Sequence, residues 1–464
     1  MVPTPLHIKH TMFAQPPHAA KAAGDISSAF VQLGSTAEPL PPRFAALKQS
    51  ISPRDPAILA LAWTRLLAQL ERETAEIERE GPNIVPQVDF AAIRANGGRF
   101  PDAVAAQIRK RGCVVIRGVV SEEQALGWKE DTKKYIARNR NRLIGFPAQD
   151  PQVWEVYWSP AQLAARENPN LNVTTGALNA LWWAEEETLV DLERSVTYCD
   201  RLRIRKPGDT SFALGEHVDG GSLERWEDDE YRKCYTKILE GDWEAFDMWD
   251  ATHRVNARMD LYNGAGGCSM FRTFQGWLSL SNAGPGRGTL RLCPLIRETV
   301  AYMMMRPLLA DLASVSDMAG AWPARVQDLS REYHEHIIRA MVSVPDVRPG
   351  DCVFWSCDTV HAVEGVAGGT EDASVFYIPA APLCELNANY LRKQRDEFEK
   401  GRTPPDFPGN HCEALIEERG KPGNLTRLGR TLMGFEHVEI SEGMGKGQRE
   451  AVRRFNVILG LRGA

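Results

Sequence analysis

The second half of the chain is a series of short apolar segments, and this feature constrains the fold most. Glycine and proline separate the segments, and β-branched residues are frequent inside them, as is typical of β-strands. The predicted strands are Val196–Arg203, Phe212–Val218, Gly267–Phe274, Gly276–Ser281, Thr289–Cys293, Asp351–Trp355 and Ser374–Ile378. Many short strands separated by turns indicate a β-sandwich or a jelly roll.

Helices are expected before this series and in two insertions within it. The first part of the chain predicts helices at Asp55–Arg79 and Pro101–Arg111, a strand at Cys113–Val120, and a helix that Ser121 caps and that ends near Arg138. Residues 1–42, rich in proline and alanine, are expected to be a disordered tail. We expect residues 43–464 to form one domain, with a helical lead-in at 55–111, a core at about 112–385, insertions at 222–262 and 297–329, and an irregular C-terminal extension at 401–464. The first insertion is rich in tryptophan and is a candidate lid.

The composition is that of an ordinary globular protein and excludes several classes. The chain has 464 residues, of which 43% are hydrophobic and 25% are charged, and its net charge is −6. No apolar run is long enough to span a membrane, and no basic excess attracts the whole chain to nucleic acid. Nine cysteines without a CxxC pair indicate reduced thiols, so we expect a cytoplasmic protein.

His217 and Asp219 form a motif that is typical of a metal site. They stand at the end of the predicted strand Phe212–Val218, and residues i and i+2 of a strand face the same side. One imidazole and one carboxylate on the same face are two of the three ligands of a non-haem iron site. A further histidine completes such a facial triad and leaves the opposite positions open for a co-substrate and O₂.

The third ligand is expected from a strand further along the chain. The chain has three motifs of the form His-x-acid, which begin at His217, His411 and His437, and only the first is followed by several strands and further histidines. His361 is the best third ligand because it follows the turn and the predicted strand at Pro349–Trp355. The pattern therefore predicts that His217, Asp219 and His361 bind a metal ion.

Four segments resemble the Fe(II)/2-oxoglutarate-dependent oxygenases of the double-stranded β-helix type. They are Arg111–Val120, His217–Asp219, Gly288–Pro294 and Pro349–His361. Three further segments, His217–Trp226, Phe271–Trp277 and Tyr377–Pro382, are similar to the YbiU-like branch of that superfamily, which occurs in bacteria and fungi. The resemblance implies an α+β fold with a double-stranded β-helix core of the jelly-roll or cupin-like kind, flanking helices and helical insertions.

The resemblance also implies a cation for 2-oxoglutarate, and here the chain departs from the common pattern. Many members of the superfamily carry an arginine about ten residues after the distal histidine, where a guanidinium group binds the far carboxylate of 2-oxoglutarate. In this chain no lysine or arginine occurs between His361 and Arg392. The candidates for this role are Arg272 first, then Arg291 and Arg117, with the hydroxyls of Thr273 and Ser374 as helpers.

The triad and the resemblance together imply a non-haem Fe(II)- and 2-oxoglutarate-dependent dioxygenase. Such an enzyme hydroxylates a small-molecule substrate with O₂ and releases succinate and CO₂. Three other classes stay open: a cupin-like metalloenzyme that does not use 2-oxoglutarate, a non-catalytic jelly-roll binding module, and an oxygenase that acts on nucleic acid. The missing arginine after His361 favours the first class, and the basic segment Arg138–Arg142 keeps the last one open despite the negative net charge.

Overall fold

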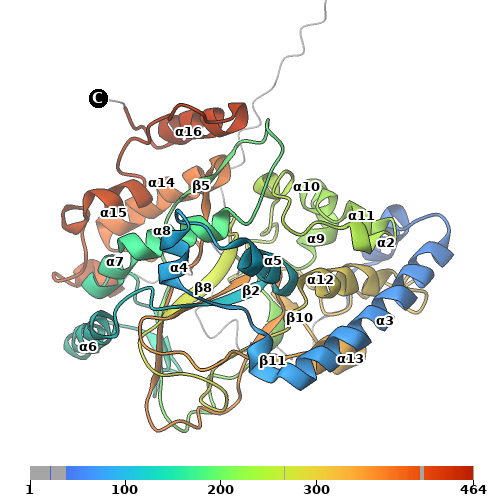
Figure 1. Ribbon diagram of the computed structural model, residues 1–464, viewed down its shortest axis with the longest axis horizontal. Helices are drawn as coiled ribbons and strands as arrows, with labels where there is room; N and C mark the ends of the chain where they lie inside the picture. The colour runs from blue at the N-terminus through green and yellow to red at the C-terminus, as the bar shows by residue number, and fades with distance from the viewer. Residues whose placement is uncertain (1–20, 22–37, 266, 408–411, 463–464) are drawn as a thin grey trace, which may run out of the picture.

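Two β-sheets lie in the middle of the structure, which is a computed structural model that describes residue 21 and residues 38–265, 267–407 and 412–462 (Figure 1). The strands of the larger sheet are β1 (Gln87–Asp89), β2 (Cys113–Arg117), β3 (Gly145–Phe146), β4 (Val153–Trp154), β6 (Leu202–Arg205), β8 (Phe274–Ser279), β12 (Cys352–Ser356) and β14 (Ala373–Tyr377). Those of the smaller sheet are β7 (Leu214–Val218), β9 (Leu290–Leu292), β10 (Gln327–Asp328), β11 (Val342–Ser343) and β13 (His361–Val363). A separate ribbon pairs β5 (Val190–Ser195) with β15 (Pro382–Cys384).

The strand order brings segments together that are far apart in the sequence. The larger sheet has the order β1-β2-β12-β8-β14-β6-β4-β3, and the smaller has the order β10-β7-β13-β9-β11. Neighbouring strands are antiparallel in both sheets except for the parallel pair of β1 and β2. One continuous hydrophobic cluster includes Trp277 of the larger sheet and Leu292 of the smaller sheet. The protein is therefore a mixed α and β structure in which the two sheets share a core.

Most of the predicted strands are present, and one prediction is wrong. Gly267–Phe274 is not a strand, because β8 begins only at Phe274. Instead, the side chain of Asn387 bonds the N–H and the C=O of Phe271, each at 2.8 Å, where a neighbouring strand would otherwise pair. The predicted strand Val196–Arg203 is also displaced, since its first part connects β5 to β6 and only its end lies in β6. Side-chain hydrogen bonds therefore replace a strand partner in the segment before β8.

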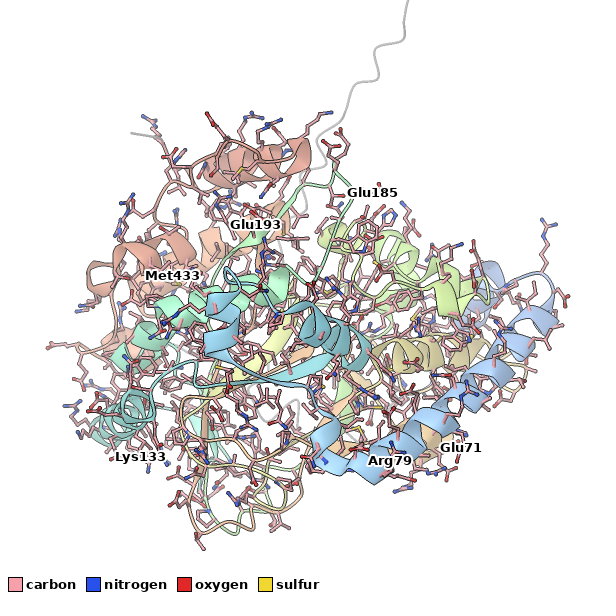
Figure 2. All side chains as sticks on the ribbon, viewed as in Figure 1. Glu71, Arg79, Lys133, Glu185, Glu193 and Met433 are labelled. Carbon is pink, nitrogen blue, oxygen red and sulfur yellow. The ribbon has the colours of Figure 1, made fainter. Side chains whose placement is uncertain are left out.

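The helical lead-in agrees with the pattern of the sequence. Its helices are α2 (Arg43–Ile51), α3 (Pro56–Glu80), α4 (Phe90–Ala95), α5 (Asp102–Arg111) and α6 (Glu122–Arg138). The side chain of Asp55 accepts a hydrogen bond from the first turn of α3, and Gly81 ends the helix at φ 56°. Figure 2 shows Glu71 and Arg79 on the outer side of α3, opposite the buried leucines of that helix. The residues 1–42 lie largely outside the described residues, so the predicted tail is not tested.

Further helices lie in the middle of the chain and in its C-terminal part. The segment between α6 and β5 holds α7 (Pro160–Arg166) and α8 (Pro169–Asn179), and the C-terminal part holds α14 (Glu385–Lys400), α15 (Arg427–Leu432) and α16 (Lys446–Ile458). The expectation of an irregular extension at 401–464 is therefore wrong for α15 and α16. Val452 and Phe455 of α16 are buried against β5, β15 and α14, because apolar residues recur on one face of an otherwise polar helix.

The first insertion packs into the body of the protein. It contains α9 (Glu224–Glu227), α10 (Asp229–Lys233) and α11 (Thr236–Leu239), and in the second insertion only α12 (Ile296–Met305) is an α-helix before α13 (Arg331–Arg339). Trp226 is buried and donates to a backbone carbonyl at the end of α12, and Trp243 is buried and donates to one in α3. The tryptophans therefore belong to the core, and the expectation of a lid is corrected.

The remaining features of the fold are short helices and free thiols. The 3₁₀-helices are η1 (Gly81–Ile84), η2 (Trp243–Ala245), η3 (Arg254–Asn256), η4 (Arg306–Leu308), η5 (Cys412–Leu415) and η6 (Pro422–Asn424). The eight cysteines whose side chains the structure describes are free thiols, and all of these except Cys234 are buried. Within the described ranges, every helix is too short or too polar to cross a membrane.

Candidate metal centre and its pocket

The two histidines of the predicted triad face each other across an antiparallel strand pair. His217 is the last but one residue of β7, His361 is the first residue of β13, and the register places them directly opposite. Opposed residues point to the same side of a sheet, and the two imidazole centroids lie 4.2 Å apart. Asp219 comes directly after β7, so its side chain is brought to the same side.

The three side chains converge on one point. The carboxylate of Asp219 lies 3.6 Å from Nε2 of His217 and 3.3 Å from Nε2 of His361, and the three donor atoms lie within 4.8 Å of one another. Nδ1 of each histidine lies 2.7 Å and 3.0 Å, respectively, from the carbonyl oxygens of Gly215 and Thr359. When Nδ1–H donates to these carbonyls, each Nε2 keeps its lone pair for a metal ion. The predicted triad is thus brought together in a form that can bind a divalent metal.

The charge states also suit a metal ion. Burial lowers the pKa of His217 to about 4, and the adjacent His361 acts in the same direction, so that this imidazole is neutral at pH 7. Burial acts to raise the pKa of Asp219, but the contacts with the two histidines and with Gln275 outweigh it and hold the pKa below its ordinary value. A neutral imidazole and an ionised carboxylate are the forms that bind metal.

Gln275 and Trp355 of the larger sheet complete the wall beside the triad. Nε2 of Gln275 donates to Oδ2 of Asp219 at 2.7 Å and so fixes the orientation of the carboxylate. Trp355 lies opposite Gln275 in the register, with its ring 5.3 Å from the imidazole of His361. Among the described residues, Oε1 of Gln275 and Nε1 of Trp355 have no hydrogen-bond partner. This wall therefore offers one acceptor and one donor to a bound molecule.

The substitution Gln275→Leu is expected to weaken metal binding. It keeps the volume of the side chain but removes the donor that orients Asp219. The loss of a hydrogen bond to a metal ligand typically lowers metal affinity by about 10- to 100-fold. Titration of the apoprotein with Mn(II), followed by calorimetry, measures this change. Gln152→Leu is the control, because that glutamine bonds Asp150 and the backbone of Lys206 outside the pocket. Equal Mn(II) affinities for the wild type and Gln275→Leu would contradict the prediction.

A pocket extends from the triad between the two sheets. On the larger sheet the inward-facing residues form three successive rows, which are Gln275 with Trp355, then Trp277 with Tyr377, then Ser279 with Val375 and Arg203. Rows on one face of a strand are about 7 Å apart. Leu214, Leu290 and Val363 of the smaller sheet line the pocket beyond the histidines. The pocket therefore has an inner end toward Arg203 and an outer end on the opposite side of the triad.

Arginines alternate at positions 201, 203 and 205, in and just before β6, and only the middle one lacks a counter-ion among the described residues; its guanidinium lies 5.6 Å from the ring of Phe212. Arg205 pairs with Asp209 at 2.8 Å and donates to the backbone carbonyls of Gly288 and Glu364. Arg201 pairs with Asp200 at 3.2 Å. Arg203 lines the pocket, is 3% exposed, and makes no hydrogen bond or ion pair with the residues that the structure describes. A buried guanidinium without a counter-ion marks a place for an anion.

Arg272, the first candidate from the sequence, also lines the pocket. It stands just before β8, and its guanidinium lies over the ring of Tyr198 at 5.2 Å. It is 9% exposed, and no hydrogen bond or ion pair joins its guanidinium to any described side chain. Because Arg272 precedes Gln275 and Arg203 lies two rows beyond it, the two guanidiniums occupy opposite ends of the pocket.

Thr273 and Ser374 do not reach the pocket, which corrects their predicted role. The hydroxyl of Thr273 donates to Oδ1 of Asn179 at 2.6 Å, and that of Ser374 donates to Asp372 at 2.6 Å. Both residues are fully buried. Ser374 alternates with the inward-facing residues of β14, so its side chain lies on the other face of the sheet.

The two alternative cations are also bound elsewhere. Arg291 pairs with Glu216 at 3.3 Å, and Arg117 pairs with Asp351 at 2.8 Å. Neither lines the pocket. Their positions exclude both from binding a molecule at the triad.

Comparison with known proteins gives the family of the chain. A model of the Gig2-like family matches residues 38–435. The chain belongs to the Gig2-like family. The uncharacterized protein YbiU of Escherichia coli (strain K12) is 36% identical to this Gig2-like chain in an alignment of 376 residues that covers 78% of this chain and 88% of YbiU. The predicted similarity to YbiU is thereby confirmed.

Solved structures share the fold of this Gig2-like protein. GIG2 (DUF1479) from Candida albicans matches with a TM-score of 0.80 and 30% identity, over 92% of this chain and 96% of that one. A protein from Salmonella typhimurium LT2, provisionally named an oxidoreductase, matches with a TM-score of 0.77 and 34% identity, over 86% of this chain and 99% of that one. The fold therefore extends over nearly the whole length of both relatives.

A buried ion cluster supports the triad of this Gig2-like protein. Asp358 is fully buried, accepts a hydrogen bond from Arg225 at 2.7 Å and forms an ion pair with Arg254 at 2.8 Å. Both arginines belong to the first insertion, whereas Asp358 lies three residues before His361. In the same insertion, Tyr231 donates to the carbonyl of Gly220, directly after Asp219. The insertion therefore holds both segments that carry the residues of the triad.

Arg203 and Gln275 are the functional residues that sequence reasoning missed. The signal for Arg203 was the alternation Arg201-Leu-Arg-Ile-Arg205, in which every second residue is a cation that a strand turns to one face. No comparable signal marks Gln275, because its role depends on Asp219 of another sheet.

Proposed function

We propose that this Gig2-like protein is a non-haem Fe(II)- and 2-oxoglutarate-dependent dioxygenase that hydroxylates a small molecule. The observation that carries the proposal is one pocket that joins the His217–Asp219–His361 triad to the unpaired guanidinium of Arg203. The strand order supports it, because β6, β7, β8 and β9 alternate between the two sheets, as do β11, β12, β13 and β14. This alternation is what a double-stranded β-helix core requires, and we propose that core for residues of about 112–385.

The chemistry of the three ligands supports ferrous iron as the metal. Two neutral imidazoles and one carboxylate are the ligand set of non-haem Fe(II) oxygenases, and three protein ligands leave further positions open. Iron bound by His217, Asp219 and His361 would supply the O₂ chemistry that no side chain can perform. The chain itself orients Asp219 through Gln275 and lines the inner pocket with apolar residues that exclude water.

The inner end of the pocket suits the far carboxylate of 2-oxoglutarate. This dianion has a 2-oxo acid group at one end, which suits a metal, and a carboxylate at the other. Arg203 can bind that carboxylate through two parallel hydrogen bonds. Tyr377 lines the pocket one row nearer to the triad, and burial raises its pKa, so that its neutral hydroxyl can donate as well. We therefore assign the far carboxylate to Arg203, and Arg272 of the outer end is left for another role.

The overall reaction consumes one O₂ for each substrate. One oxygen atom enters the substrate, where it converts C–H to C–OH, and the other enters succinate as 2-oxoglutarate loses CO₂. The protein contributes the geometry, since it holds both co-substrates and the substrate at one metal ion and keeps bulk water out.

Binding and turnover of 2-oxoglutarate test the proposed function directly. The Mn(II)-loaded protein is expected to bind 2-oxoglutarate, and Arg203→Met is expected to weaken this binding by about 10- to 100-fold because a charge-assisted pair is lost. Calorimetry measures the affinity. With Fe(II) and O₂, the wild type is expected to form succinate slowly without substrate, and anaerobic samples give the background.

Two other functions are outcomes of the same test. A metal-loaded protein that does not bind 2-oxoglutarate would overturn the proposal and favour a metalloenzyme without this co-substrate. A protein that binds neither metal nor 2-oxoglutarate would favour a binding module.

A further inference from the structure

The outer end of the pocket contains a guanidinium that the proposed function does not use. Arg272 is 9% exposed and lines the pocket. Its guanidinium has no hydrogen bond or ion pair within the described part of the chain, and its only ring contact is with Tyr198. A buried cation that lacks a partner is costly unless an anion joins it. This position therefore requires an explanation.

The neighbours of Arg272 do not neutralise its charge. Burial raises the pKa of Cys268 to about 12 and that of Cys357 to about 11, so both thiols are uncharged at pH 7. Asp406 also lines the pocket, but this carboxylate pairs with Lys21 at 3.7 Å and accepts hydrogen bonds from Ser269 and Tyr198. Asp219, the carboxylate of the triad, is needed as a metal ligand. The positive charge at the outer end is thus available to a ligand.

We infer that Arg272 recognises an anionic group on the substrate, so that the substrate class is a small molecule bearing a carboxylate or a phosphate. The inference rests on the proposed function, since it takes the inner end to be occupied by 2-oxoglutarate. The planar guanidinium can bind either oxyanion through two donors. An apolar body beside the anion fits the aromatic surface, because Tyr198 and Phe407 both line this part of the pocket, with their rings 5.8 Å apart.

Because the two arginines lie at opposite ends of the pocket, their substitution is expected to affect 2-oxoglutarate affinity differently. In the Mn(II)-loaded protein, Arg203→Met is expected to weaken 2-oxoglutarate binding, whereas Arg272→Met is expected to change this affinity by less than about threefold. Retained 2-oxoglutarate binding also shows that Arg272→Met is folded. If Arg272→Met weakens 2-oxoglutarate binding as Arg203→Met does, Arg272 is a cofactor anchor and the inference is overturned.

Three probes then test the recognition of an anion. Benzoate, phenyl phosphate and neutral benzamide are titrated by calorimetry into the protein loaded with Mn(II) and 2-oxoglutarate. At least one of the two anions is expected to bind about 10- to 100-fold more tightly than benzamide. The anion that binds more tightly shows whether Arg272 recognises a carboxylate or a phosphate. Arg272→Met is expected to abolish the preference, Arg272→Lys to retain part of it, and Arg291→Met to leave it unchanged, because Arg291 pairs with Glu216 outside the pocket.

The results separate the inference from the proposed function. Equal affinities for the anions and benzamide, or no binding of any probe at millimolar concentration, would overturn the inference while 2-oxoglutarate binding stands. If the protein does not bind 2-oxoglutarate but still prefers the anions in an Arg272-dependent manner, the proposed function fails and the anion site remains.

Discussion

The substitution His361→Ala is expected to abolish metal binding and to reduce succinate formation to the anaerobic background. Two side chains remain after the substitution, His217 and Asp219, and two ligands cannot form the facial triad that non-haem iron requires. The fold should survive, because His361 stands at the first residue of the short strand β13 and the substitution keeps the backbone pairing of that strand. Mn(II) titration by calorimetry and a succinate assay with Fe(II) measure the two effects.

His437→Ala is the matched control for this experiment. His437 belongs to a second His-x-acid motif, with its Nδ1 3.3 Å from Glu439, but it lies outside the pocket. We expect this variant to bind Mn(II) and to form succinate as the wild type does. If His361→Ala retained the metal affinity of the wild type, the metal centre would have to be elsewhere.

Among the substitutions considered, Asp358→Asn is expected to cause the largest loss in the free energy of unfolding. It leaves Arg225 and Arg254 buried without a counter-ion, and removal of one partner from a buried ion pair typically costs about 3 to 5 kcal/mol. Denaturant unfolding followed by circular dichroism measures the free energy of unfolding. Metal affinity should fall as well, because Asp358 supports the segment that leads to His361.

An exposed aspartate provides the control for Asp358→Asn. Asp229 also pairs with an arginine, Arg232, but its side chain is 82% exposed. Exposed pairs contribute about 1 kcal/mol or less, so Asp229→Asn should leave the free energy of unfolding nearly unchanged. Equal losses for the two variants would contradict the role of the buried cluster.

The pH dependence of the Asp358 contribution has a definite sign. Burial acts to raise the pKa of Asp358, but Arg225 and Arg254 outweigh it and hold this pKa below its ordinary value of 3.8. A carboxyl whose pKa is lower in the folded state stabilises the fold above its unfolded pKa. The difference between the wild type and Asp358→Asn should therefore persist at neutral pH and decrease as the pH falls below about 4.

The convergence of His217, Asp219 and His361 could be predicted from the sequence because their placement depends on local rules. Two residues of one strand share a face at spacing i and i+2, and His361 was the histidine that followed a strand late enough in the chain. Ser374 shows the limit of such reasoning. Its strand was predicted correctly, but a shift of one residue moves a side chain to the other face, and it is Val375 and Tyr377 that face inward.

The rest of the site depends on pairings between distant segments, which no single segment specifies. Arg203 faces Val375 across a separation of more than 170 residues, and only this register places its guanidinium at the inner end of the pocket. The same holds for Asp358, whose partners Arg225 and Arg254 lie in an insertion that the composition alone suggested to be a lid. Contacts between distant segments determine the surroundings of Arg203 and of Asp358. The tryptophans of the insertion are buried for the same reason.

The direct opposition of His217 and His361 has a consequence for folding. These residues are adjacent across β7 and β13 but far apart along the chain, so an ion bound to both acts as a cross-link that closes a long loop. The ion binds well only in the native register, since a slip of one residue would turn one imidazole away. A bound metal ion would therefore select the correct pairing of the two strands, and its binding free energy would add to the stability of the native state.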